Sequence, residues 1–362
     1  MAAGRHRPKG RVTAVRILIW HVHGSWTTGF VQGPHDYVLP VLPGRGPDGA
    51  GRAQSWDWPS RAREVSTERL REEEIDVVVL QRPHEAELVR AWTGRVPGRD
   101  VPAVYLEHNV PGGRVPFDRH PMAEQRRIPL VHVTHFNALL WDNGSAPFRV
   151  IEHGVPDPGH RYTGELAHAA VVVNEPVRRG RAVGTDLVLG FARHQPIDVF
   201  GIDAHLLRTL PGVPPELTTV EGLDQERLHA EMARRRVYLH PNRWTSLGLS
   251  LVEAMLLGMP VVVVASTESA VAVPAGTGIV STRPDELAAG LRKLCHDVDL
   301  ARAVGEDARA HALRRFDLRR FLRDWDAVLS DVVRDAEVAP DVNPTRAPHA
   351  SAGSGALPVD AS

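Results

Sequence analysis

Residues 237–264 read VYLHPNRWTSLGLSLVEAMLLGMPVVVV. This stretch predicts a strand that ends at His240, a polar loop, a helix over about Ser250 to Leu257, and a new strand over Val261–Val264. Gly258 marks the end of the helix, since glycine is the residue that most readily adopts the left-handed conformation found there. A strand, a helix and a second strand in this order are typical of a parallel α/β sheet.

Short apolar runs recur along the rest of the chain without alternation, as expected of parallel strands that are buried on both faces. In the first half they are Val15–Trp20, Tyr37–Val41, Ile75–Leu80, Val101–Leu106 and Leu130–Thr134. In the second half they are Ala169–Val173, Ile197–Phe200, Leu217–Val220, Val237–His240 and Val261–Val264. Helical patterns lie at Ser66 to Glu74, Asp224 to Arg235, Ser250 to Leu257 and Leu318 to Val333. The order predicts two Rossmann-like α/β domains facing each other across a cleft, where ligands of such sheets bind.

The predicted domains divide at a proline-marked segment that follows Arg149. We expect an N-terminal Rossmann-like acceptor domain over residues 14–150, a C-terminal donor domain over 151–315, and a C-terminal helix over 316–336. Residues 1–13 and 337–362 lack periodicity, and the tail is rich in Ala, Pro, Ser and Gly, so both ends are predicted to be disordered.

The composition argues against a general attraction to nucleic acid. The chain of 362 residues has a formal net charge of −1, so any phosphate that it binds must be met by local groups. Only two of its 43 basic residues are lysines, Lys9 and Lys293. This bias suggests a GC-rich genome, such as that of an actinobacterium. It also means that arginines or backbone amides must bind phosphate here.

Several classes of site and location are disfavoured. The single cysteine, Cys295, excludes an internal disulfide and a cysteine zinc cluster. The 19 histidines are scattered, without a His-Glu-x-x-His pattern, so no metal or other cofactor is expected. The longest apolar runs are far shorter than a bilayer span, and no signal-peptide core follows the basic N-terminus. We therefore expect a cytoplasmic protein.

The helix near Ser250 suits a bound anion. A helix N-terminus presents unpaired N–H groups and a partial positive charge, and Gly248 lets the backbone approach a ligand closely. The amides of residues 246–249 (Ser246, Leu247, Gly248, Leu249) are predicted to hold a diphosphate, while Glu253 accepts hydrogen bonds from a ribose diol. The alternative is a buried crossover helix whose glutamate faces solvent.

The same stretch resembles the donor-binding motif of the large retaining glycosyltransferases of the GT-B fold (family 4, glycosyl transferases group 1). That family carries E-G-F-G-L-x-x-L-E-A-M-A-x-G-x-P-V-V after a strand that ends in His-Pro-Ser. The match is without gaps at His240, Pro241, Gly248, Leu249, Glu253, Ala254, Met255, Gly258, Pro260, Val261 and Val262. The segment beginning at Arg149 resembles the family's interdomain junction, and Val183-Gly-Thr-Asp resembles its K-G-x-D turn. The resemblance spans roughly residues 15–335.

The resemblance implies a hexosyltransferase that moves a sugar from a UDP- or GDP-sugar to a hydroxyl acceptor, with retention and without a metal ion. Front-face attack assisted by the departing phosphate requires no protein nucleophile. Two departures from the family bear on this expectation. The family's first glutamate is Thr245 here, and its phosphate lysine is Val183. The cluster Arg178-Arg-Gly-Arg is expected to supply the missing charge through guanidinium contacts with phosphate. Arg178 is placed as the family's partner arginine and assigned a catalytic role, with Arg179 and Arg181 beside it. Alternatively, this arginine run is a solvated surface, and Glu175 neutralises part of it.

On the N-terminal side, Gly24 and Ser25 stand where the family has a glycine turn that faces the diphosphate. His108 stands where a histidine commonly lies near the donor sugar, and is assigned a catalytic role. His135 and Asn137 are weaker candidates for the acceptor side. His21 and His23 are more simply read as core or rim histidines. Four tryptophans can stack on sugar rings or pack in cores: Trp26, Trp56, Trp58 and Trp141.

Two other functions stay open. A nucleotide-sugar epimerase or hydrolase can use the same fold and ribose carboxylate. A non-catalytic nucleotide-sugar or glycan-binding protein fits the changes at Thr245 and Val183. The acceptor and the oligomeric state are not predicted. Peripheral contact with a membrane stays open, although no basic amphipathic helix is evident.

Overall fold

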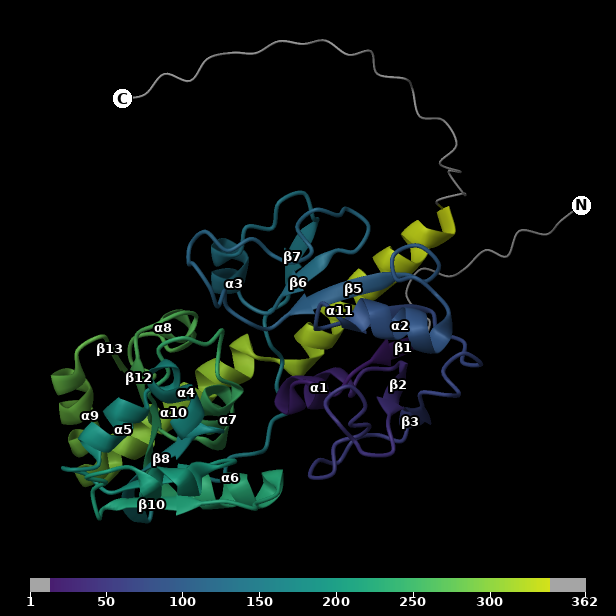
Figure 1. The fold of residues 1–362 in the computed structure, drawn as a ribbon. Helices are drawn as coiled ribbons and strands as arrows, with labels where there is room; N and C mark the ends of the chain where they lie inside the picture. Colours follow the sequence, from purple (N-terminus) through teal and green to yellow (C-terminus); the bar gives the residue numbers. More distant parts are fainter. Residues whose placement is uncertain (1–13, 339–362) are drawn as a thin grey trace, which may run out of the picture.

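The computed structural model describes residues 14–338, and these form two α/β domains, each built on an all-parallel sheet. The N-terminal sheet has the strand order β3-β2-β1-β4-β5-β6-β7 and the C-terminal sheet the order β10-β9-β8-β11-β12-β13. Figure 1 shows the two domains side by side, with the N-terminal domain in purple to blue and the C-terminal domain in teal to green.

The N-terminal sheet places its first strand near the middle, between β2 and β4. Its strands are β1 (Arg16–Ile19), β2 (Asp36–Val41), β3 (Ala62–Ser66), β4 (Val77–Leu80), β5 (Ala103–Glu107), β6 (Leu130–His132) and β7 (Phe148–Val150). The helices of this half are α1 (Gly24–Phe30), α2 (Glu85–Thr93) and α3 (His135–Leu140).

The C-terminal sheet is centred on β8 and β11, and residues 151–165 connect it to β7. Its strands are β8 (Leu166–Val172), β9 (Ile197–Phe200), β10 (Leu217–Val220), β11 (Arg235–His240), β12 (Val261–Val264) and β13 (Ile279–Ser281). Its helices are α4 (Pro176–Arg179), α5 (Thr185–Phe191), α6 (Gln225–Arg234), α7 (Leu249–Leu257), α8 (Ser269–Ala272), α9 (Pro284–His296) and α10 (Val298–Arg315), with 3₁₀ turns η1 (Gly180–Val183) and η2 (Ala204–Thr209).

The last helix, α11 (Leu318–Val338), returns to the N-terminal domain, as Figure 1 shows in yellow-green. Phe321 and Trp325 are buried in the same core as strand residues Ile17, Val77 and Val104. The opposite face of this sheet packs against α2 through a separate core that includes Val89. The N-terminal fold therefore depends on both ends of the described chain.

Every apolar run predicted as a strand overlaps one, but β3, β7 and β13 were not predicted. The helix predicted over Ser66 to Glu74 is wrong. Ser66 ends β3, and the residues after it form turns whose N–H groups bond to the carbonyl three residues back, such as Arg69 to Ser66. Glu73 forms an ion pair with Arg63 of β3, so its carboxylate packs beside the strand. The predicted disorder covers residues 1–13 and 337–362. Residues 1–13 and 339–362 lie outside the described part of the chain, but Glu337 and Val338 are the last residues of α11, so the prediction is wrong for these two.

Candidate functional site

The helix α7 begins at Leu249, directly after Gly248 at its N-cap position. No side chain caps this end, so the first-turn N–H groups keep their capacity to bind an anion. A Cβ on Gly248 would lie 2.5 Å from Cε1 of His240, which is the last residue of β11. The close packing of this imidazole therefore requires glycine at the tip of the helix.

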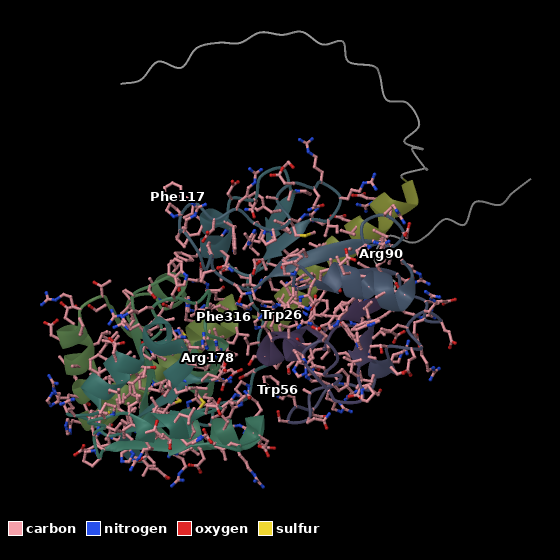
Figure 2. All side chains as sticks on the ribbon, viewed as in Figure 1. Trp26, Trp56, Arg90, Phe117, Arg178 and Phe316 are labelled. Carbon is pink, nitrogen blue, oxygen red and sulfur yellow. The ribbon has the colours of Figure 1, made fainter. Side chains whose placement is uncertain are left out.

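The tip of α7 faces a cleft between the domains. One chamber of about 520 Å³ is lined by the ends of β8, β9 and β10 and by the start of α7. A second chamber of about 640 Å³ lies toward the interdomain connection, at residues 155–158. The two chambers share five lining residues, Ser25, Ser55, Trp56, Gln225 and Glu253. Figure 2 labels Trp56 on the side of the N-terminal domain that faces the C-terminal domain.

Glu253 lies at the junction of the two chambers, one turn into α7, and its residue is only 5% exposed. Its Oε1 accepts a hydrogen bond from the Ser25 hydroxyl at 3.0 Å, which joins the two domains. Its Oε2 lies 3.4 Å from Nε2 of His229 on α6. The carboxylate therefore faces the cleft and not bulk solvent, unlike in the alternative drawn from the sequence.

Five of the predicted donor-site residues line the first chamber: Ser25, Thr245, Gly248, Leu249 and Glu253. Gly24 lies beside them, because a Cβ there would approach the Trp56 ring at 3.2 Å. Ser246 and Leu247 are buried and do not line either chamber. Only the backbone of these two residues is therefore a candidate for ligand contact.

The arginines after β8 separate into different environments. Arg178 is exposed and paired with Glu175, and it does not line the cleft. Figure 2 labels it on the C-terminal domain. Arg181 is exposed and donates to Asp186 at 2.9 Å. Arg179, in contrast, lines the first chamber, and burial lowers its pKa. Of the three arginines in this cluster, the structure thus brings Arg179 to the cleft, and not Arg178 or Arg181.

The missing phosphate lysine has no substitute at its own position. Val183 is 1% exposed and belongs to the core of the C-terminal domain. The turn next to it is tight, because a Cβ on Gly184 would lie 2.1 Å from the Pro241 carbonyl oxygen. The turn therefore contributes packing and not charge to this side of the cleft.

His108 is buried below the cleft and lines neither chamber. Its Nε2 is 3.1 Å from Oε1 of Gln81, whose amide nitrogen donates to the Trp20 carbonyl. Because Gln81 Oε1 can only accept, His108 carries its proton on Nε2. Burial holds the pKa of His108 well below its ordinary value, and its ring centroid lies 3.9 Å from that of His23. The imidazole is therefore neutral near pH 7.

The two weaker acceptor-side candidates also differ in position. His135 is exposed, while Asn137 is buried and donates from Nδ2 to the Asn109 carbonyl at 3.2 Å. Near them, the Trp244 indole nitrogen donates to the Pro111 carbonyl across the domains at 2.8 Å. The loop that leads to α7 is therefore anchored on the N-terminal domain. Sequence spacing gave no signal for this contact.

Between residues 14 and 338, no three His, Cys, Asp or Glu side chains come together as potential metal ligands. No helix in this range is long and apolar enough to cross a membrane.

Known proteins give the arrangement a context. Residues 211–311, which include α6, α7 and the part of the chamber lining that these helices supply, match the family model of glycosyl transferases group 1. A search of curated proteins finds no significant sequence match to the chain.

Solved structures match over most of the chain. Sucrose-phosphate synthase from Thermosynechococcus elongatus aligns with a TM-score of 0.65 and 13% identity, covering 89% of this chain and 100% of that one. HepE from Anabaena in complex with UDP-glucose aligns with a TM-score of 0.62 and 15% identity, covering 88% and 100%. A glycosyltransferase from Rickettsia africae aligns at 0.59 and 14%, covering 89% and 99%. The fold is therefore GT-B, as the resemblance in sequence predicted.

Proposed function

We propose that this protein is a retaining glycosyltransferase that moves a sugar from a nucleotide-sugar donor, such as a UDP- or GDP-sugar, to a hydroxyl acceptor. The observation that carries the proposal is Glu253, a nearly buried carboxylate in an interdomain cleft, one turn behind the uncapped tip of α7. The family match over residues 211–311 and the GT-B fold support glycosyl transfer. HepE, a protein of similar fold, has been crystallised with UDP-glucose.

The proposed chemistry relies on binding and charge stabilisation. Amides at residues 246–249 would hold the diphosphate, and Arg179, which lines the cleft, would add a guanidinium charge. Preorganised donors of this kind stabilise a leaving group, and loss of one costs about 10²–10³ in rate in known enzymes. The donor would then be bound without a metal ion, and the proposed location is the cytoplasm.

The first test combines a donor screen with one substitution. UDP, GDP and their sugars are added to the wild type, and the shift in its melting temperature is measured, since a ligand that binds only the folded state stabilises it. The Glu253→Ala variant should bind the best nucleotide roughly 100-fold more weakly, because a charged acceptor for two hydroxyl groups is lost. Glu306→Ala, on the exposed side of α10, serves as the control. Wild-type affinity in Glu253→Ala would refute the donor site.

A non-catalytic nucleotide-sugar-binding protein is the second candidate, and the burial of Val183 together with the uncharged Thr245 favours it. The two candidates separate in an assay of the bound donor with a panel of sugar, lipid and small-molecule acceptors. A glycosylated product with the anomeric configuration of the donor supports the transferase. Binding without any turnover supports the second candidate, and an epimerised donor formed without acceptor would indicate an isomerase.

A further inference from the structure

The carboxylate of Glu253 has one partner from each domain. Ser25 belongs to α1 of the N-terminal domain, so its hydrogen bond to Oε1 depends on how the two domains sit. His229 belongs to α6, which packs against α7 within the C-terminal domain. Its contact with Oε2 therefore stays with the carboxylate when the domains move apart.

His229 is held firmly in place. Its residue is 8% exposed, and Gln225, one turn earlier on α6, brings its side-chain nitrogen within 2.7 Å of the same ring nitrogen, Nε2. The start of α6 is fixed by Asp224, whose side chain accepts from the Arg227 N–H at 2.8 Å. In this placement the Gln225 amide nitrogen donates to Nε2, which then carries no proton for Oε2 of Glu253. With the amide turned so that its oxygen faces the ring, Nε2 carries the proton and lies 3.4 Å from Oε2.

A ribose diol makes strict geometric demands on its acceptor. Two adjacent hydroxyl groups donate well only to a carboxylate that is held in one rotamer, and a buried glutamate has three side-chain torsions to restrain. A neighbouring donor that fixes one oxygen leaves the other oxygen and the remaining lone pairs oriented toward the cleft. Gln225, His229 and Glu253 all line the second chamber, so this edge of the carboxylate is open to a ligand.

We propose that His229 is a positioning residue for the ribose diol: it holds Oε2 of Glu253 from α6, so that the carboxylate is oriented to receive both hydroxyl groups of a nucleotide. This inference rests on the proposed function. Ser25 has a different role. A bound diol donates to Oε1 of Glu253 in place of the Ser25 hydroxyl, so the hydrogen bond between the domains is broken. Nucleotide binding and this interdomain bond are then alternatives.

The test measures binding of UDP and GDP, and of their 2′,3′-dideoxy counterparts, by calorimetry. The proteins are the wild type, His229→Leu, His229→Gln and His168→Leu. His168 is a matched control, because it also pairs with a carboxylate, Asp198, but lines neither chamber. Thermal unfolding of each variant establishes that it is folded.

His229→Leu should weaken binding of the preferred diol nucleotide about tenfold, which is the size of one hydrogen bond to a charged group. Its affinity for the dideoxy nucleotide should equal that of the wild type. His229→Gln keeps an N–H donor and should lie within about threefold of the wild type. His168→Leu should not change either affinity.

Other outcomes distinguish the role of His229 from the proposed function. Equal losses for the diol and dideoxy nucleotides, or no loss in His229→Leu, would overturn the role of His229 while leaving the proposed function intact. A wild-type protein that binds neither UDP nor GDP would overturn the proposed function and the diol role together.

Discussion

At the scale of single residues, Arg178 and Arg179 are adjacent in sequence but have different surroundings. Arg178 is 69% exposed in its side chain and forms a pair with Glu175, whose pKa is lowered chiefly by that hydrogen bond. Arg179 is half-buried in the wall of the cleft, and the structure records no ion pair for it within residues 14–338. A charge that is already paired in water adds little to ligand binding, whereas a partly desolvated charge adds more.

The prediction is therefore that Arg179→Gln weakens UDP or GDP binding at least about tenfold, while Arg178→Gln changes it less than about threefold. Titrations at low and high salt would measure both affinities. The salt dependence should decrease only in Arg179→Gln, because screening acts on the charge that meets the phosphates. A larger loss in Arg178→Gln would restore the assignment that the family resemblance implied.

The sequence alone could place some site residues but not their partners. Gly248 and Glu253 stand at fixed spacing along one loop and helix, so a local motif is enough to find them. The bond between Ser25 and Glu253 joins residues that are 228 positions apart. His229 lies on a separate helix with no motif of its own. Such pairs depend on tertiary packing, which a single sequence does not contain.

At the scale of elements, the strongly apolar central strands were predictable, whereas of the four edge strands only β10 was predicted. The runs in β1, β4 and β12 are fully or almost fully buried. The strands β3, β7 and β13 are at the sheet edges, and their residues are only partly buried. Edge strands tolerate polar residues, so they lose the apolar run that marks a central strand. The charged residues between Ser66 and Glu74 favoured the wrong prediction of a helix there.

The turn between η1 and α5 gives a prediction for stability. Gly184 has a φ of +75°, and a Cβ there would lie 2.1 Å from the Pro241 carbonyl oxygen. Gly184→Ala should therefore destabilise the protein by more than about 2 kcal/mol, through the positive φ and the backbone clash together. Thermal or chemical unfolding measures the change.

Gly190 provides the matched control for this turn. It lies within α5, and a Cβ there meets no atom within 4 Å. Gly190→Ala should stabilise the protein by about 0.5–1 kcal/mol, because alanine loses less backbone entropy in a helix. Equal effects of the two substitutions would show that the turn is not constrained as described.

At the scale of the whole molecule, the domain contacts are made by residues that no sequence pattern connects. Trp244 contacts Pro111 across 133 positions, and the Phe136 N–H donates to Glu268 across 132 positions. The two α/β domains followed from the order of strands and helices, and their GT-B type followed from the family resemblance. The contacts between the domains could not be predicted in this way, because they join side chains that are far apart in sequence and belong to no repeating pattern.

Buried histidines near the domain junction make the stability of the whole molecule sensitive to acid. Burial lowers the pKa of His153 to about 3 and, with the charge of Arg82 and His21, that of His23 to about 4. Burial alone lowers the pKa of His240 to about 4. The unfolded chain takes up these protons near pH 6.5, while the folded chain takes them up only at lower pH. Stability is therefore lost as the pH falls below about 6.5, down to the folded pKa values.

His153 offers the clearest test, because neither of its ring nitrogens has a hydrogen-bond partner in the described structure. A buried histidine that stays neutral costs the fold about 1.4 kcal/mol for each pH unit below its unfolded pKa. His153→Leu removes this cost without removing a hydrogen bond. Unfolding by urea at pH 7 and pH 5 should show a smaller loss of stability in His153→Leu than in the wild type, by up to about 2 kcal/mol. Gly190→Ala, which changes no titratable group, should keep the wild-type pH dependence, and parallel curves for His153→Leu and the wild type would contradict the buried, neutral state of this imidazole.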